Sequence, residues 1–276
     1  MEDQGSGNDL SALLDDLAVG LADPDCDVDA LHDVEEQLVA AQQAALIPRL
    51  EAHLEAAVQA GNWYGRCVLA RILATTAGRS CLATLLRAFS RDLGDDQDDL
   101  TTTLVVFAQE DPVAARSILV PWVETSDKDL RRAAIWLFGY VPPEPADLPL
   151  LTQAARDPDE RLRSTVVGTL GSHGKNPAAV DLLVSLLADP STQVRVSALS
   201  SLGFLHQPGT LPHVFRLADD STTRIRAWVA IALGRFHAAE HGDPNIAAVL
   251  DRLRADPDPY VREQATTARR MSSRST

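Results

Sequence analysis

The sequence predicts an all-α fold of stacked antiparallel helix pairs. A motif recurs along the second half of the chain, with an aliphatic residue next to an arginine in every copy. Successive aliphatic residues lie 32, 32, 31 and 36 positions apart. In the four copies that end in glycine, the glycine follows the aliphatic residue by nine positions. Two constant spacings indicate a structural repeat. The aliphatic markers are Leu130, Leu162, Val194, Ile225 and Val261.

Each copy is predicted to form two helices joined by a short turn. The first helix carries an apolar stripe and ends at Asp-Pro, because proline cannot continue a helix. The second helix places Leu162, Val166, Val167 and Leu170 on one face. Its terminal glycine suits a left-handed C-cap. Since a single pair cannot bury its own stripe, neighbouring pairs must stack into a superhelix. The predicted N-cap residues of the second helices are Asp159, Ser191, Ser221 and Asp258.

Upstream of residue 125 the same register continues in a weaker form. Leu69, Leu73, Leu100 and Leu104 fit second helices, but these copies lack the Asp-Pro and the Val-Arg pair. Residues 9–21 and 29–41 are expected to form a leading helix pair. We therefore expect degenerate helical repeats over 1–124 and regular repeats over 125–276, in one continuous array. The tail, 271–276, is expected to be disordered.

The pattern Asp-Pro…Val-Arg…Ala…Leu-Gly, as in residues 189–203, resembles the HEAT-repeat family, including the HEAT-like repeats of phycobilisome lyases. The resemblance implies a right-handed α-α superhelix of about eight antiparallel helix pairs. It also implies that the second helices line the inner, concave surface.

The charge is unevenly distributed. The chain has 39 acidic and 25 basic residues, a net charge of -14. Residues 1–125 hold 22 acidic and 7 basic side chains, whereas residues 126–276 hold 17 and 18. This balance disfavours nucleic acid as a partner. No apolar run reaches the length of a membrane helix and no signal-peptide core follows the acidic N-terminus, so we expect a cytoplasmic protein. Two Lys against 23 Arg is typical of a GC-rich bacterial genome.

The repeated arginines and aspartates form a set in register with the repeat. Each of the aspartates lies six residues ahead of an arginine. The arginines could form an anion-binding ladder. We favour a structural role in which each Asp-Arg pair ties the inter-helix turn to its own or the next repeat, because recurring residues belong at repeat interfaces. The set comprises Arg131, Arg163, Arg195, Arg226 and Arg262 with Asp157, Asp189, Asp220 and Asp256.

The face of each second helix opposite its core carries unexpected aromatic residues. Aromatic and arginine side chains are favoured at binding hot spots, and an exposed apolar stripe marks a partner surface. Small residues between them, such as Gly168 and Ser200, would leave a trough. Alternatively, some of the aromatics pack against a neighbouring second helix. The candidate groove residues are Arg132, Trp136, Tyr140, Phe204, Trp228, Ile231 and Arg235, and Trp63 with Tyr64 extends the groove.

Metal and catalytic motifs are weak. Seven histidines occur, but none precedes a glutamate, so the His-Glu iron ligands of HEAT-repeat hydroxylases are missing. His173, His206 and His237 recur just past the second helices, where the helix dipole favours positive charge. The segment Asp25–Glu36 resembles a calcium loop, but Ala30 replaces the turn glycine; an acidic turn followed by a helix is the alternative. We expect no catalytic residue, metal or cofactor.

These observations favour a non-catalytic scaffold that binds a protein or peptide in the concave groove. One alternative is an acidic inhibitor or immunity-type protein that masks a basic partner. Another is a lyase-like or nucleic-acid-acting HEAT enzyme, which rests on analogy of fold.

Overall fold

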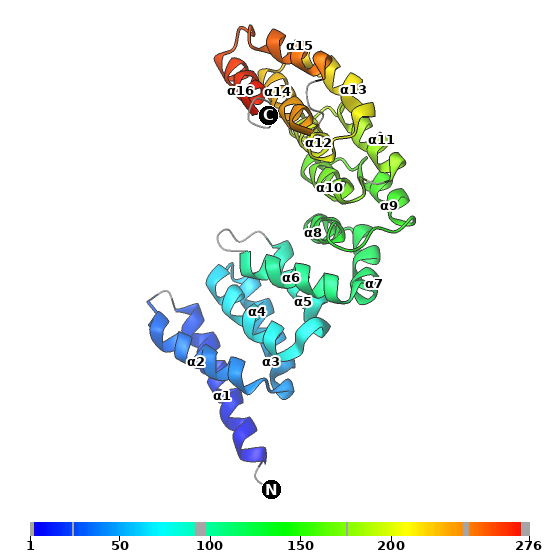
Figure 1. The fold of residues 1–276 in the computed structure, drawn as a ribbon. Helices are drawn as coiled ribbons and strands as arrows, with labels where there is room; N and C mark the ends of the chain where they lie inside the picture. Colours follow the sequence, from blue (N-terminus) through cyan, green and yellow to red (C-terminus); the bar gives the residue numbers. More distant parts are fainter. Residues whose placement is uncertain (1–2, 24, 92–97, 175, 240–242, 272–276) are drawn as a thin grey trace. The chain divides into compact units, whose positions relative to one another are not determined.

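The computed structural model describes residues 3–23, 25–91, 98–174, 176–239 and 243–271 (Figure 1). Over these ranges all the regular structure is helical. The chain divides into two compact units, residues 1–142 and residues 143–276, and each is described here by itself. The predicted all-α fold of antiparallel helix pairs is confirmed. No helix within the described ranges is long and apolar enough to cross a membrane.

Unit 1 contains four helix pairs. The second helices α2, α4 and α6 pack side by side, and the predicted register residues Leu69, Leu73 and Leu104 are buried. The predicted leading pair corresponds to the first two helices. The helices are α1 (Asp3–Ala22), α2 (Val28–Ala41), α3 (Ile47–Gln59), α4 (Trp63–Ala77), α5 (Leu82–Ser90), α6 (Asp98–Glu110), α7 (Pro112–Val123) and α8 (Lys128–Phe138), with 3-10 turns at Ala44–Leu46 and Gly78–Cys81.

Unit 2 repeats the same pair four times with greater regularity. In Figure 1 its second helices form one row and its first helices another, and α10, α12, α14 and α16 pack successively on one another. The core face of α10 is fully buried, as predicted. The helices are α9 (Asp147–Ala154), α10 (Glu160–Ser172), α11 (Pro177–Leu186), α12 (Thr192–Leu205), α13 (Leu211–Arg216), α14 (Thr223–Ala239), α15 (Pro244–Leu253) and α16 (Pro259–Met271), with 3-10 turns at Pro208–Thr210 and Leu217–Asp219.

Three of the four predicted N-caps are confirmed. The side chains of Asp159 and Ser191 accept hydrogen bonds from the backbone N–H two residues on, and Asp258 does the same for Tyr260. Ser221 does not cap its helix, since α14 begins at Thr223, one residue later than the prediction required.

The role predicted for the terminal glycines is wrong. Their backbones are not left-handed; Gly139 has a φ of -66°, and Gly171, Gly203 and Gly234 lie inside helices. A Cβ on Gly203 would stand 3.1 Å from the Cα of Ala232, and one on Gly234 would stand 2.8 Å from the Cβ of Ala268. These two glycines therefore let successive second helices approach closely.

The predicted division of the chain at residue 125 concerns sequence regularity and stays a prediction. The two compact units meet later, between Pro142 and Pro143. Helix α16 ends at Met271, and the rest of the predicted disordered tail, 272–276, lies outside the described residues.

We predict that Gly234→Ala lowers the free energy of unfolding by about 1–3 kcal/mol, because the added methyl group overpacks the α14–α16 contact. The matched control is Gly168→Ala in α10, where a Cβ would meet nothing within 4 Å. Alanine is the better helix former by about 1 kcal/mol, so this control should be neutral or stabilising. Urea unfolding followed by circular dichroism measures both changes. Equal destabilisation by the two substitutions would contradict the packing role.

Candidate functional site

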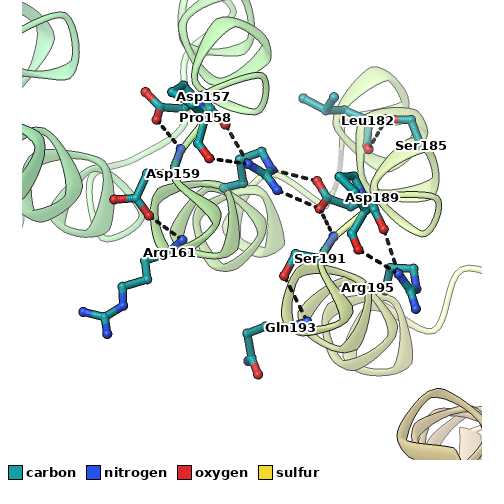
Figure 2. A network of polar contacts seen from close by, with 12 residues as sticks. Asp157, Pro158, Asp159, Arg161, Leu182, Ser185, Asp189, Ser191, Gln193 and Arg195 are labelled. Atoms are coloured by element: carbon teal, nitrogen blue, oxygen red, sulfur yellow. Dashed lines mark hydrogen bonds and ion pairs between the residues drawn. The ribbon is translucent and has the colours of Figure 1, made fainter. Parts of the chain in front are cut away.

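The repeated arginine of α10 holds two turns at once. Arg163 Nη1 donates to the carbonyl oxygens of Asp157 (2.7 Å) and Pro158 (3.1 Å) in its own repeat. Its Nε and Nη2 donate to both carboxylate oxygens of Asp189 in the next repeat, at 2.8 and 2.9 Å. Asp189 Oδ1 also accepts the backbone N–H of Ser191 within its own turn (Figure 2). The guanidinium thus ties its own turn to the turn of the following repeat.

The same arrangement recurs in α14. Arg226 Nη1 donates to the carbonyl of Asp220 (2.9 Å), while its Nε and Nη2 meet the carboxylate of Asp256 at 2.7 and 3.0 Å. Between these two sites the contact is looser. Arg195 keeps its bond to the carbonyl of Asp189 (2.9 Å; Figure 2), but its Nη2 lies 4.0 Å from Asp220 Oδ1. The looser contact falls where the repeat is 31 residues long, the shortest of the four intervals.

Arg262 and Arg131 also bond the turn that precedes their own helix. Arg262 Nη1 donates to the carbonyls of Asp256 and Pro257, and Arg131 Nη1 donates to the carbonyl of Thr125 at 2.9 Å. The repeated arginines therefore share one contact, to the turn that precedes their own helix. Guanidinium groups held in this way are poorly placed to form an anion-binding ladder.

The arginines shift the pKa values of two of the aspartates. The hydrogen bond from Arg226 lowers the pKa of Asp256 and outweighs the opposing effect of burial. Burial raises the pKa of Asp189, but the hydrogen bonds from Arg163 and from the Ser191 backbone outweigh it, so that pKa also lies below its usual value. Both carboxylates are therefore charged at neutral pH.

The second-helix face of unit 2 carries an exposed aromatic residue and an arginine. The Phe204 side chain on α12 is 64% exposed, and the guanidinium carbon of Arg235 on α14 lies 3.8 Å from its ring centroid. Arg235 Nη1 also lies 3.3 Å from the carbonyl and the hydroxyl of Ser200. On α14, Ile231 lies one turn before Arg235 and Trp228 lies two turns before it, and both are half-buried. The structure therefore links four predicted positions, Phe204 and Arg235 by direct contact and the other two by helical spacing.

The remaining three predicted residues belong to unit 1. Trp136 on α8 is half-buried, and its ring stacks on Phe89 of α5 with centroids 4.7 Å apart. Tyr140 packs against Trp136 at 5.2 Å and is 42% exposed, while Arg132 lies 3.9 Å from Asp129. Trp136 thus packs partly within its own unit, as the alternative interpretation allowed, although against a first helix.

A pocket of about 610 Å³ opens between α2, α4 and α6 in unit 1. Its walls include Trp63 and Tyr64 at the start of α4, whose rings meet edge to face with centroids 5.8 Å apart. On the α2 side, Arg71 Nε donates to the buried carboxylate of Glu35 at 2.5 Å. The two aromatics were predicted to extend the groove, but the pocket has no signal in the sequence, because its walls come from three helices whose repeat signatures are degenerate. His32, Cys67 and Asp99 also line the pocket.

A serine, a histidine and an aspartate lie in line at the end of α10, but their hydrogen bonds indicate a structural role. His173 Nε2 lies 3.3 Å from Asp147 Oδ2, and both residues are buried. His173 Nδ1 lies 3.0 Å from the carbonyl of Thr169, and the Ser172 hydroxyl donates to that same carbonyl at 2.7 Å. The Ser172 hydroxyl also lies 3.1 Å from His173 Nδ1, but its proton is donated to the Thr169 carbonyl, and each ring nitrogen has an acceptor within reach. The pair instead ties the start of α9 to the end of α10.

The segment that resembles a calcium loop, Asp25–Glu36, is not a loop over most of its length, because α2 begins at Val28. Asp27 is the N-cap of α2 and accepts the backbone N–H groups of Asp29 and Ala30, so the later acidic residues lie on helical turns. Within the described ranges no three His, Cys, Asp or Glu residues are grouped so that they could hold a metal ion. His241 lies outside those ranges.

Comparison with family models supplies the family. The model described as HEAT repeats matches residues 117–202 and again residues 180–269. The two matches together span more than half of the chain. The chain belongs to the HEAT-repeat family. The search of curated proteins finds no match.

Solved structures with the same repeat type match at low identity. YibA of Escherichia coli is 18% identical, with 99% of this chain and 97% of that chain covered at a TM-score of 0.53. The complex of CpcE and CpcF of phycocyanin lyase from Nostoc sp. PCC7120 is 24% identical, with a TM-score of 0.46; 57% of this chain and 65% of that chain are covered, which is less than two thirds of the latter. At these identities the likeness concerns the fold alone.

We predict that the HEAT-type Asp256–Arg226 pair makes the protein sensitive to acid. A carboxylate whose pKa is lowered on folding stabilises the fold at pH values above its unfolded pKa, and this stability is lost as the pH falls through the folded pKa. Asp256→Asn should therefore lower the free energy of unfolding at pH 7 by about 1.5–3 kcal/mol and flatten its decline between roughly pH 5 and pH 2.

Thermal unfolding at a series of pH values measures this effect. The matched control is Asp219→Asn, which removes an exposed partner of Arg252 at 3.3 Å and should cost less than about 1 kcal/mol. An unchanged acid limb in Asp256→Asn would contradict the assigned pair.

Proposed function

We propose that this chain is a non-catalytic HEAT-repeat scaffold that binds a protein partner on the second-helix face of unit 2. The observation that carries the proposal is the pair of Phe204 and Arg235. A largely exposed phenylalanine forgoes about 1.5–3 kcal/mol of burial in the free protein. A partner that covers the ring regains that energy. Exposed apolar surface is typical of protein-binding sites.

The chemistry around Phe204 supports a protein partner. Burial lowers the pKa of Arg235, but a guanidinium stays protonated and can bond a carboxylate or a backbone carbonyl. Trp228 adds a second aromatic side chain, on α14, the helix that carries Arg235. Tryptophan, tyrosine and arginine are enriched at binding hot spots. Gly168 on α10 is exposed with open space above it, so the partner meets little obstruction there.

The contacts that recur between repeats support placing the binding site on the second-helix face around Phe204. The Arg163–Asp189 and Arg226–Asp256 pairs hold adjacent turns together. Gly203 and Gly234 allow close contacts between second helices. What remains to distinguish one HEAT protein from another is the set of side chains that differ between repeats on the second helices. Phe204, Trp228 and Arg235 belong to that set.

The proposal predicts that Phe204→Ala abolishes capture of the partner. Quantitative affinity capture from cells that produce the protein, with the tagged chain as bait, should show at least a tenfold loss of the specific prey because a hot-spot truncation costs about 2 kcal/mol or more. Circular dichroism of the variant should match that of the wild type, since the ring is mostly exposed.

The matched control is Val113→Ala on the first helix α7. Val113 is also an exposed large apolar residue, so its truncation removes apolar surface at a site in the other unit. Prey proteins that survive Phe204→Ala and disappear with Val113→Ala would overturn the proposed face.

A further inference from the structure

The pocket between α2, α4 and α6 has the dimensions of a ligand site. Its volume of about 610 Å³ falls within the range of about 300–1,000 Å³ that is typical of such sites. It lies on the second-helix face of unit 1 and has one aromatic wall and one polar wall. Neither wall belongs to the surface around Phe204.

The aromatic wall is formed by Trp63 and Tyr64. Trp63 is 42% exposed although it is the first residue of a well-packed helix, and Tyr64 meets it edge to face. An exposed indole face attracts a cation that lies within about 6 Å of the ring centroid. Such a wall also offers apolar contact to the methylene stem of a long basic side chain.

The polar wall is acidic. Arg71 neutralises Glu35, and this hydrogen bond raises the pKa of Arg71 despite the opposing effect of burial; Glu36 and Asp99 raise it further. Of the two carboxylates that line the pocket, Glu35 is bonded to Arg71. The other is that of Asp99, which is exposed and for which no ion pair is seen among the residues that the structure describes.

Helices α4 and α6 begin at the pocket and contribute partial positive charge from their N-termini. That charge is about half a unit per helix and partly satisfied, since Asn62 already accepts an N–H of the first turn of α4. The surroundings decide the balance. Residues 1–142 carry 24 acidic and 10 basic side chains and hold the whole net charge of -14, whereas residues 143–276 carry 15 of each.

We propose that this pocket binds an arginine or lysine side chain from a basic segment of a partner protein, with the cation over Trp63 and facing Asp99. The methylene stem lies along the aromatic wall, and the field of unit 1 attracts the segment from a distance. This inference is independent of the role proposed for Phe204, because the two sites share no residue and lie in different units.

The test uses the full chain and a fluorescein-labelled peptide with two arginines among glycines and serines. Fluorescence anisotropy at low salt should show binding that weakens as salt is added. The same peptide with glutamine in place of arginine should not bind. Trp63→Ala should weaken binding about three- to tenfold, and Trp63→Phe should weaken it less. Phe204→Ala should leave it unchanged, which separates failure here from failure of the proposed function.

Charge variants decide whether the pocket or the general acidity of unit 1 is responsible. Asp99→Asn should weaken binding about threefold, whereas Glu55→Gln on α3, which removes the same charge from an exposed site outside the pocket lining, should have a smaller effect. Arg71→Gln should strengthen binding, because it removes the resident cation. Equal effects of Asp99→Asn and Glu55→Gln, or weaker binding by Arg71→Gln, would overturn the proposal. The latter result would point to an anionic ligand.

Alkylation of cysteines locates the peptide without any substitution. Cys67 lines the pocket, Cys26 does not, and burial raises the pKa of Cys81 to about 12, so Cys81 should stay unmodified. Bound peptide should slow modification of Cys67 relative to Cys26. Unchanged modification of Cys67 at saturating peptide would place the peptide elsewhere and overturn the assignment.

Discussion

The guanidinium group of the repeated arginine holds the regular part of this solenoid together. In Arg163 and Arg226 one nitrogen bonds the turn of its own repeat, while two others bond the aspartate of the next repeat. The aspartate in turn fixes its own turn by accepting a backbone N–H two residues on. Such a bidentate, charge-assisted contact defines both distance and orientation. The turns at Asp189 and Asp256 are therefore positioned by the repeat before them.

The contact also explains why the arginines of unit 2 are abundant without making that unit basic. Its 15 basic residues are balanced by 15 acidic residues, and some of these balance locally, within the repeat interfaces. Unit 1 lacks the repeated pair over most of its length. Its acidic residues outnumber its basic residues by 24 to 10, and this excess creates a long-range field.

The sequence predicted the helices and their cores well, because burial in a helix pair imposes a period of 3.6 that survives even in the degenerate repeats. It also predicted three N-caps, because capping depends only on the residues at the start of the helix. The glycines were misassigned: a glycine near a helix end suits a C-cap, and only the approach of Ala232 and Ala268 from the next helix shows that Gly203 and Gly234 serve packing. The pocket beside Trp63 could not be predicted either, since it depends on how three helices are spaced.

The strongest signal in a solenoid sequence is thus the least informative about its ligands. Residues that recur in every repeat make the contacts between repeats. Here the arginine and the aspartate bond adjacent turns, and Gly203 and Gly234 allow close helix packing. An exposed side chain that occurs in one repeat only, such as Phe204 or Trp63, is not needed for the contacts that recur between repeats. Its exposure to water is unfavourable for the free protein. The two also differ in their surroundings. Phe204 lies beside a guanidinium in a unit of zero net charge, where binding energy must come from contact. Trp63 lies among carboxylates in a unit that carries the entire charge of -14, where attraction begins before contact.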